Sequence, residues 1–397
     1  MILKLFSRLL REVSPRILYK TAFNLCLKNM INVIRFQKRQ RCNKPFFPGF
    51  MILSLTTHCN LSCQGCWISS DVPREMPIEM AREIIQSCIK KGSYYFGLVG
   101  GEPLLYPWLF QLIEEFPEAY FQLFSNGTFL TFEVAEKLHK LGNVSPLISI
   151  EGLDKESDRR RNGKGVFTSA MEALENCRKN KLLTGVASSV CNNNFEQLVD
   201  DEFIRQLIAK GAHYLWYYIY RPVGPKPHPE QTLSSEQILQ LRRFIVEARS
   251  NHPIGIIDTY WDAEGRAVCP GAMGLSHHIS PTGSIEFCPP MQFAFDKLEP
   301  GESFSEKIRN ASFLAELRKK IAKETRGCIL LNNPGLLLQW LKEMGAVDSS
   351  ERNSAFLELK KMTVKPCHHR SGQEIAENNW FYKLAKKYGF FGFSAYG

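Results

Sequence analysis

Strand-like and helix-like segments alternate along residues 50–224. Short runs of apolar, β-branched and aromatic residues predict six buried strands, and apolar residues at helical spacing predict the helices between them. The expected strands are residues 51–55, 94–99, 120–124, 147–150, 186–190 and 214–219, and the expected helices lie near residues 77–91, 132–141, 167–180 and 195–210. This alternation indicates an α/β fold with a parallel sheet and right-handed crossovers. In such folds ligands bind at the carboxyl ends of the strands.

The chain divides into three parts by composition. Its 397 residues, 44% of them hydrophobic, can build one large domain or two to three smaller ones. Residues 222–229 are rich in proline and predict a boundary. We therefore expect a basic amphipathic helical segment at residues 1–47, an α/β core at 48–225 and a carboxyl-terminal extension at 226–397.

Residues 1–44 hold the whole excess of positive charge. They contain eleven Lys and Arg residues against one acid, Glu12, which equals the net charge of +10 for the chain. Apolar residues recur with helical spacing between Ile17 and Phe36. Such a helix can lie on an anionic membrane surface, or it can pack on the rest of the protein with its Lys and Arg in water, and the sequence leaves both open. No aromatic-rich basic patch follows elsewhere, so no nucleic-acid partner is expected.

Cysteine usage and hydropathy indicate a compartment. Twelve cysteines in a chain of this length do not make a small disulfide scaffold, and the first apolar residues are interrupted by charge, unlike a secretory signal. No apolar run approaches the 18 or more residues that span a bilayer. We expect an oxygen-sensitive cytoplasmic metalloprotein, with any membrane association at its amino terminus.

Three cysteines directly follow the first expected strand. Cys59, Cys63 and Cys66 are separated by three and then two residues, so one loop can wrap around a single metal cluster. Three thiolates on a 4Fe–4S cluster leave one iron free to bind a small molecule. A structural zinc site would need a fourth ligand. His58 is the nominal candidate, but it abuts Cys59 and adjacent residues rarely both reach one ion. Unligated core thiols have no reason to cluster.

The spacing Cys-x3-Cys-x2-Cys resembles the signature of radical S-adenosylmethionine (radical SAM) enzymes. This resemblance implies a partial (β/α)6 barrel over residues 48–225 and a 4Fe–4S cluster whose open iron chelates the amine and carboxylate of SAM. It also implies that an electron cleaves SAM to a 5′-deoxyadenosyl radical, which abstracts hydrogen from a substrate. The electron would come from an external donor such as flavodoxin or ferredoxin.

Further segments at strand ends resemble the SAM-binding motifs of that family. Gly100, Gly101, Glu102 and Pro103 are similar to the GGE motif that meets the amine of SAM. Glycines let the backbone approach a ligand closely, and the acid offers an acceptor. Residues 125–128 are similar to a TNG segment common in that family, or they form an ordinary turn. Residues 149–152 and 159–163 are similar to the S-x-D-G … R-x-G region that contacts the ribose and carboxylate of SAM. The residues expected there are Asn126, Ser149, Glu151 and Arg161.

The chain departs from the family pattern at two points. Glu151 stands where Asp is usual, and the sequence does not decide which arginine of the run 159–161 takes the carboxylate. Gly65 occupies the place of an aromatic that covers adenine in many members. Trp67 offers a replacement aromatic face, or it is an ordinary core residue.

Four more cysteines follow the expected boundary. Cys269 and Cys288 flank Gly283 and a segment, 281–286, that predicts a hairpin, a frame similar to SPASM and twitch extensions. This resemblance implies one auxiliary 4Fe–4S cluster completed by Cys328 and Cys367. His368 and His369 compete as ligands or form a solvated polar turn. The other five cysteines lack partner spacing and are expected to be ordinary thiols: Cys26, Cys42, Cys88, Cys177 and Cys191.

The resemblance implies a radical SAM oxidoreductase or maturase, with peptide or protein maturation favoured. A small-molecule or membrane-linked substrate of cofactor biosynthesis is the alternative. A non-catalytic iron–sulfur electron-transfer protein is a remote one. The aromatic tail from Trp380 to Gly397 either closes over the active site, docks a partner or packs on the barrel.

Overall fold

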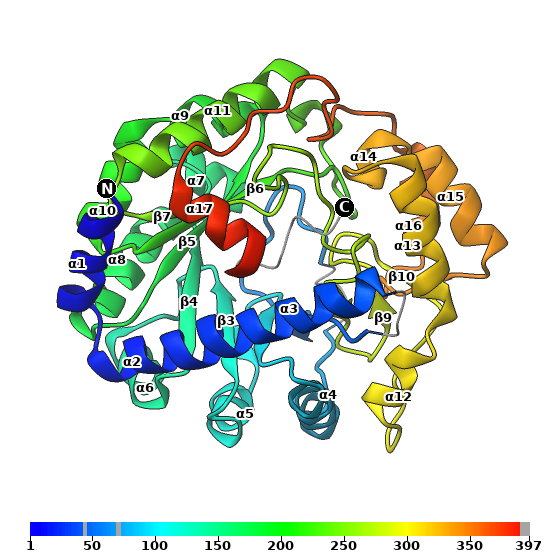
Figure 1. The fold of residues 1–397 in the computed structure, drawn as a ribbon, viewed down its shortest axis with the longest axis horizontal. Coiled ribbons are helices and arrows are strands. Elements are labelled where there is room, and N and C mark those ends of the chain that lie inside the picture. The colour runs from blue at the N-terminus through cyan, green and yellow to red at the C-terminus, as the bar shows by residue number, and fades with distance from the viewer. Residues whose placement is uncertain (43–45, 69–72, 390–397) are drawn as a thin grey trace.

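The computed structural model describes residues 1–42, 46–68 and 73–389. A nine-stranded sheet with the order β7-β6-β5-β4-β3-β2-β1-β8-β9 forms its centre (Figure 1). Strands β1 to β8 run parallel to their neighbours, and β9 is antiparallel to β8. The six predicted strands are β1 (Phe50–Thr56), β2 (Tyr95–Gly100), β3 (Tyr120–Ser125), β4 (Val144–Ser149), β5 (Gly185–Val190) and β6 (Tyr214–Ile219). The expected α/β fold is confirmed.

The predicted helices lie between these strands, with one correction. Residues 195–210 form two helices, because Asp200 interrupts the run and its side chain accepts from the amide of Glu202 to begin the second helix. Two short helices, α5 and α7, were not predicted. The helices of this part are α4 (Ile78–Lys91), α5 (Leu109–Glu115), α6 (Phe132–Leu141), α7 (Lys155–Arg161), α8 (Val166–Lys179), α9 (Phe195–Leu198) and α10 (Asp201–Lys210).

The sheet continues beyond the proline-rich segment 222–229. Strand β7 (Gly255–Ile257) pairs with β6, and β8 (Ser276–Ile279) pairs with β1 on the opposite edge. Strand β9 (Ile285–Glu286) completes the predicted hairpin. The two sides of this segment therefore share one sheet, while the division into three domains stays a prediction.

The remaining carboxyl-terminal elements are mostly helical. A two-stranded ladder joins β10 (Phe293–Ala294) to β11 (Val347–Asp348). The helices are α11 (Ser235–Asn251), α12 (Phe304–Arg309), α13 (Ser312–Glu324), α14 (Ile329–Asn332), α15 (Pro334–Glu343), α16 (Ala355–Lys361) and α17 (Trp380–Leu384), with short turns at η2 (Pro103–Leu105), η3 (Asn192–Asn194), η4 (Pro229–Gln231) and η5 (Ala385–Gly389).

Alternate residues of the strands face two different cores. Leu53 and Leu55 of β1 belong to the larger cluster shared with the surrounding helices. Phe50 belongs to a smaller, aromatic cluster with Tyr120 and Trp216 on the inner face of the sheet. This alternation is that of a parallel barrel-like sheet buried on both faces.

The amino-terminal helices pack across the starts of the strands. They are α1 (Ile2–Glu12), α2 (Pro15–Lys20), η1 (Thr21–Leu27) and α3 (Lys28–Arg41). The Asn32 amide donates to the carbonyl of Gly49 just before β1, and the Asn24 amide donates to the carbonyl of Pro117 before β3. One face of the amino-terminal helices therefore packs on the rest of the protein, which was one of the two arrangements expected for residues 1–47.

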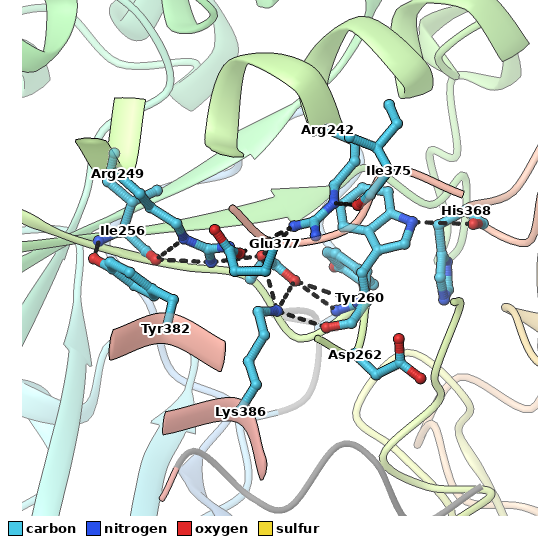
Figure 2. Close-up of polar contacts among 12 residues, drawn as sticks. Arg242, Arg249, Ile256, Tyr260, Asp262, His368, Ile375, Glu377, Tyr382 and Lys386 are labelled. Atoms are coloured by element: carbon cyan, nitrogen blue, oxygen red, sulfur yellow. Dashed lines mark hydrogen bonds and ion pairs between the residues drawn. The ribbon is translucent and has the colours of Figure 1, made fainter. Parts of the chain in front are cut away.

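A buried ionic network joins α11 to the carboxyl-terminal segment. Arg242 and Arg249 of α11 face Asp258 and Glu377, and Lys386 of η5 donates to Asp258 at 3.0 Å (Figure 2). All five side chains are at most 4% exposed. The described part of the carboxyl-terminal tail is thus anchored in the protein, and residues 390–397 lie outside the described residues.

The helices of the described residues fall short of the requirements for a membrane span. None of those built by the described residues combines the length and the hydropathy that a bilayer span requires.

Candidate active site

The cysteine triplet lies on an irregular loop after the carboxyl end of β1. Cys59, Cys63 and Cys66 are all partly exposed. Two of the sulfurs receive N–H donors: the Leu61 amide lies 3.4 Å from Cys59 Sγ, and Arg161 Nη1 lies 3.8 Å from Cys63 Sγ. Such donors suit thiolates, because hydrogen bonds and positive charge stabilise a negatively charged sulfur.

The three thiols influence one another electrostatically. Burial raises the pKa of Cys66 to about 11, and the neighbouring Cys63 and Cys59 add to the rise. Burial also raises the pKa of Cys59, with Cys63 contributing. No group of three His, Cys, Asp or Glu side chains in the described residues converges on a single metal ion. Thiolates of a 4Fe–4S cluster bind separate irons and stand apart, so this absence does not bear on a cluster. Three neighbouring thiols on one partly exposed loop, with donors aimed at them, fit such a cluster.

Gly100 and Gly101 let the end of β2 approach the beginning of the cysteine loop. A Cβ on Gly100, whose φ is +138°, would lie 2.2 Å from the Thr56 carbonyl oxygen, and one on Gly101 would lie 2.1 Å from that of His58. The amides of Gly101 and Glu102 donate to these same two carbonyls at 2.7 and 2.8 Å. The two glycines therefore allow the end of β2 to pack closely against the loop that carries the cysteines.

Substituting Gly101 tests this packing. Gly101→Ala is expected to destabilise the protein by about 1–3 kcal/mol, because its Cβ overlaps backbone that cannot move aside. Urea unfolding measures the loss, and iron bound after reconstitution reports the displacement of residues 56–58. Gly335→Ala is the matched control, since nothing lies within 4 Å of a Cβ there. Equal stability of the two variants would contradict the expectation.

Glu102 is a fully buried carboxyl that ties three loops together. It accepts from the amide of Asn126 at 2.7 Å and from that of Leu104 at 3.1 Å. Burial raises its pKa to about 7, although these amide donors oppose the rise. Pro103 begins the short turn η2 beside it, and Asn126 also donates to the Asn60 side chain at 2.8 Å. The β2 and β3 ends therefore converge on the cysteine loop.

The arginine run on α7 separates into three roles. Arg159 pairs with Glu156 at the surface, and Arg160 donates to the Gln64 carbonyl at 2.7 Å. Arg161 reaches both Cys63 and Glu151, whose carboxylate lies 2.8 Å from Arg161 Nη2 and also accepts from the amide of Ser189. Arg161 is thus the arginine that joins the end of β4 to the cysteine loop. Ser149, the last residue of β4, is only partly buried.

Gly65 has a physical reason to lack a side chain. Its φ is +67°, and a Cβ there would lie 2.2 Å from the Tyr220 hydroxyl. Tyr220 follows β6, and the Arg160 guanidinium stacks 4.6 Å from its ring centroid. Trp67 instead meets the His278 ring edge-on at 5.4 Å. An aromatic ring therefore does stand beside residue 65, but it comes from the far strand of the barrel.

The four later cysteines are brought together from distant parts of the chain. Burial raises the pKa of Cys269 to about 11 and that of Cys288 well above its usual value, and Cys328 adds to both shifts. Burial also raises the pKa of Cys367, again with a contribution from Cys328. Each of these three thiols therefore lies near Cys328. Arg221 Nε lies 3.1 Å from Cys328 Sγ and places a positive charge against the group.

The two histidines after Cys367 point elsewhere. His368 is buried and its Nε2 contacts the carbonyl of Val268 at 3.0 Å, while His369 Nδ1 contacts the Thr325 hydroxyl at 3.2 Å. The expectation of a solvated turn is wrong for His368, because Trp261 and Tyr260 enclose it. The five unassigned cysteines are free, with Cys26 and Cys42 exposed and Cys88, Cys177 and Cys191 buried.

A buried polar group beside the site, centred on His278, was not predicted from the sequence. His278 on β8 contacts Glu286 at 2.6 Å through Nδ1 and Ser54 at 2.8 Å through Nε2, and Trp67 lies against it. Ser54 is the polar exception within an apolar strand run, which is a readable signal. The pairing of β8 with β1 brings His278 to it, and that pairing is not visible in the sequence.

Comparison with known proteins agrees with this geometry. Residues 53–200 match the radical SAM superfamily. The chain is 31% identical over 171 residues to the sporulation killing factor maturation protein SkfB of Bacillus subtilis (42% of this chain, 41% of that protein). It is 27% identical over 198 residues to the AdoMet-dependent heme synthase of Methanosarcina barkeri (48% and 57%). With the mycofactocin maturase MftC of Mycolicibacterium smegmatis it shares 31% over 259 residues (61% and 64%). The matches span about half the length of these relatives.

A solved structure shows the same fold. Streptococcus suis SuiB bound to the precursor peptide SuiA matches with a TM-score of 0.60 at 13% identity, over 71% of this chain and 69% of that one. The matched residues 53–200 contain the cysteine loop, the glycine pair that packs on it and the arginine that reaches it. Residues 53–200 of the chain therefore match a radical SAM domain.

Proposed function

We propose that this protein is a radical SAM enzyme that cleaves SAM reductively and uses the resulting 5′-deoxyadenosyl radical to abstract hydrogen from a peptide. The observation that carries this proposal is the loop of Cys59, Cys63 and Cys66, seated on Gly100–Glu102 backbone and reached by Arg161. When bound there, a 4Fe–4S cluster supplies the electron that breaks the carbon–sulfur bond of SAM.

The surrounding residues position SAM. The three thiolates hold the cluster, and Glu102 with the backbone of Gly100 and Gly101 takes the methionyl amine. Arg161, oriented by Glu151 at 2.8 Å, takes the carboxylate, and Asn126 and Ser149 contact the ribose side. Burial of Glu102 and Asn126 excludes water from these contacts and strengthens them.

The second group of thiols is proposed to hold one auxiliary 4Fe–4S cluster. Cys269, Cys288, Cys328 and Cys367 supply four ligands, with Arg221 offsetting their negative charge. Held by these four residues, a fully ligated cluster would supply a one-electron acceptor for a substrate that has already lost a hydrogen atom.

A hollow between the two cysteine groups offers a substrate site. It is lined by the proline-rich segment after β6, by residues near Cys288 and by α16. Gly224 packs against the carbonyl of Cys66, and Arg352 donates to the carbonyl of Trp67 at 3.1 Å. The apolar lining includes Val223, Pro290, Phe293, Leu330 and Met362. We propose that part of a peptide substrate contacts this hollow, and the SuiB structure holds a precursor peptide.

A small molecule of cofactor biosynthesis is the second candidate substrate. The similarity to a heme synthase favours it. A short precursor peptide encoded or purified with this protein would favour the first candidate. We further propose a flavodoxin or ferredoxin as electron donor, and a cytoplasmic protein with peripheral membrane contact through residues 1–44.

Anaerobic reconstitution with a SAM-cleavage assay tests the proposal. The full chain is expected to bind about eight irons, which is two 4Fe–4S clusters, and to form 5′-deoxyadenosine with a low-potential reductant. About four irons with intact cleavage would remove the auxiliary cluster. A protein that carries its iron–sulfur clusters but neither binds nor cleaves SAM would contradict the proposal and favour a non-catalytic electron-transfer protein.

The buried carboxyl of Glu102 predicts a pH dependence of SAM binding. Its pKa of about 7 means that the charged form, which attracts the amine of SAM, grows as pH rises. The SAM dissociation constant of the reconstituted enzyme is therefore expected to fall about tenfold from pH 6 to pH 8. Glu102→Gln should flatten this profile. Titration calorimetry at both pH values measures it, and an unchanged slope in the variant would exclude Glu102 as the titrating group.

A further inference from the structure

The helices at the two ends of the chain bury several polar residues alongside Ile17, Val33 and Phe36, and they expose large apolar ones. Their polar residues face the protein: Arg8, Asn24, Asn29, Asn32 and Lys386 are buried. Their large apolar residues face outward. Leu3 of α1 is 84% exposed, and Trp380 of α17 is 69% exposed. A surface helix of a globular protein keeps its apolar stripe toward the core, so a second set of large apolar side chains facing outward is unusual.

The buried polar residues have partners that explain their position. Arg8 donates to the carbonyls of Ala212 and Pro253, before β6 and β7. Asn32 and Asn24 donate in the same way before β1 and β3. These side chains satisfy backbone carbonyls at the amino ends of the strands. These hydrogen bonds explain why the polar residues point inward. They do not explain why large apolar side chains point outward.

The outward residues gather on one part of the molecule. Among the described residues, thirteen of the nineteen exposed large hydrophobic side chains lie in residues 1–34 and 380–388. Phe6 of α1 meets Phe381 of α17 at 6.0 Å, and Gln37 of α3 donates to the carbonyl of Lys387. Figure 1 shows α3 and α17 on the near side of the molecule and α1 at its left rim. We call this the terminal-helix face: Met1, Leu3, Phe6, Leu10, Tyr19, Phe23, Leu27, Met30, Ile31, Ile34, Trp380, Leu384 and Tyr388.

Positive charge surrounds these apolar side chains. Within residues 1–42 the acid is Glu12, which is paired with Arg8 at 2.9 Å, and residues 380–388 contain none. The exposed basic residues of the two segments are Lys4, Arg11, Arg16, Arg35, Lys38, Arg39, Arg41, Lys383 and Lys387. An apolar stripe with tyrosine and tryptophan, rimmed by Lys and Arg, is the pattern of helices that lie in an anionic membrane surface.

We propose that the terminal-helix face docks on an anionic lipid bilayer. The nearly continuous helix from Pro15 to Arg41 is about 40 Å long and lies along the surface, with Leu27, Ile31 and Ile34 inserted between headgroups. Helix α17 extends the contact beyond the amino terminus. The proposal is independent of the chemistry at the clusters.

The docking orientation follows from the fold. Asn32 and Lys20 bind the amino ends of β1 and β4, whereas the cysteine loop follows the carboxyl end of β1. The bilayer therefore contacts the closed end of the barrel, and the site mouth faces water. A substrate reaches the site from solution and is not drawn directly from the lipid.

Vesicle flotation of the reconstituted full chain tests this proposal. The protein is expected to float with phosphatidylglycerol vesicles and at least tenfold less with phosphatidylcholine vesicles. Leu27→Gln/Ile31→Gln/Ile34→Gln should weaken partitioning about a hundredfold, and Lys38→Gln/Arg41→Gln about tenfold or more. The matched control is Trp108→Gln/Phe132→Gln/Val364→Gln, which removes equally exposed apolar groups elsewhere and should float like the wild type.

Two results would overturn the proposal. One is loaded, monomeric protein that floats with neither vesicle. The other is a dimer in sedimentation that the same triple substitution dissolves, since a second copy would then cover the face. Hydrogen exchange on vesicles tests the orientation: residues 3–34 and 380–388 should slow, while protection of residues 59–66 would place the site mouth on the bilayer instead.

Discussion

Replacing Cys59, Cys63 and Cys66 with alanine is expected to abolish 5′-deoxyadenosine formation, below detection in an assay with excess reductant and SAM. The cluster site loses all three thiolates, so the iron that binds SAM has nothing to hold it. Bound iron should fall from about eight to about four per chain, because the second group of thiols is untouched. Anaerobic reconstitution, iron analysis and chromatography of the nucleoside products measure both quantities.

The matched control replaces two other thiols. Cys26 and Cys42 are exposed and lie outside both cysteine groups, so Cys26→Ala/Cys42→Ala should keep full iron and full cleavage. The complementary variant, Cys269→Ala/Cys288→Ala, should lose about four irons yet still cleave SAM without turning over the substrate. Cleavage retained in the triple variant would refute the assignment of the first loop.

Local patterns were enough to predict the barrel strands and the first cysteine loop. Each strand is a run of apolar residues, and the three cysteines are eight residues from end to end. The helix break at Asp200 is also local. It was missed because apolar residues continue at helical spacing on both sides of Asp200, whose side chain caps the second helix. These features depend on neighbours in sequence, which spacing and periodicity describe well.

Features that depend on long-range packing were beyond the sequence. Adjacent residues on a helix point in different directions, so only the placement of α7 separates Arg161 from Arg160. Tyr220 explains the departure at Gly65, yet it comes directly after the last strand of the predicted barrel, far away in sequence. The amphipathic pattern of residues 17–36 was readable, but the burial of Asn24, Asn29 and Asn32 was not. The carbonyls that those polar residues bind come from loops throughout the barrel.

Asp258→Asn is expected to destabilise the folded protein by about 3–5 kcal/mol. The buried network holds three cations, Arg242, Arg249 and Lys386, and two anions, Asp258 and Glu377. Burial alone would raise the pKa of Asp258, but Lys386, Arg249 and Arg242 outweigh it and hold the pKa well below its usual value. Neutralising Asp258 leaves three buried cations facing one carboxylate. Removing one partner of a buried ionic group is strongly destabilising, because it leaves buried charge without compensation.

The charge balance orders a set of variants, and urea unfolding at pH 7 measures them. Lys386→Met leaves two cations with two anions and should be milder, about 1–2 kcal/mol, as it removes hydrogen bonds to Asp258 and Trp261. Asp258→Asn/Lys386→Met should then lose less than the sum of the single effects.

Because the folded pKa of Asp258 is depressed, its contribution is full above about pH 4 and declines as pH falls further. The gap between wild type and Asp258→Asn should therefore be constant from pH 5 to 7 and shrink in acid. A gap that instead widens below pH 4, or additive single effects, would mean that the network is not a coupled ionic group. Since Lys386 and Glu377 flank α17, the same substitution should speed amide exchange in residues 380–388 and so loosen the carboxyl-terminal part of the terminal-helix face.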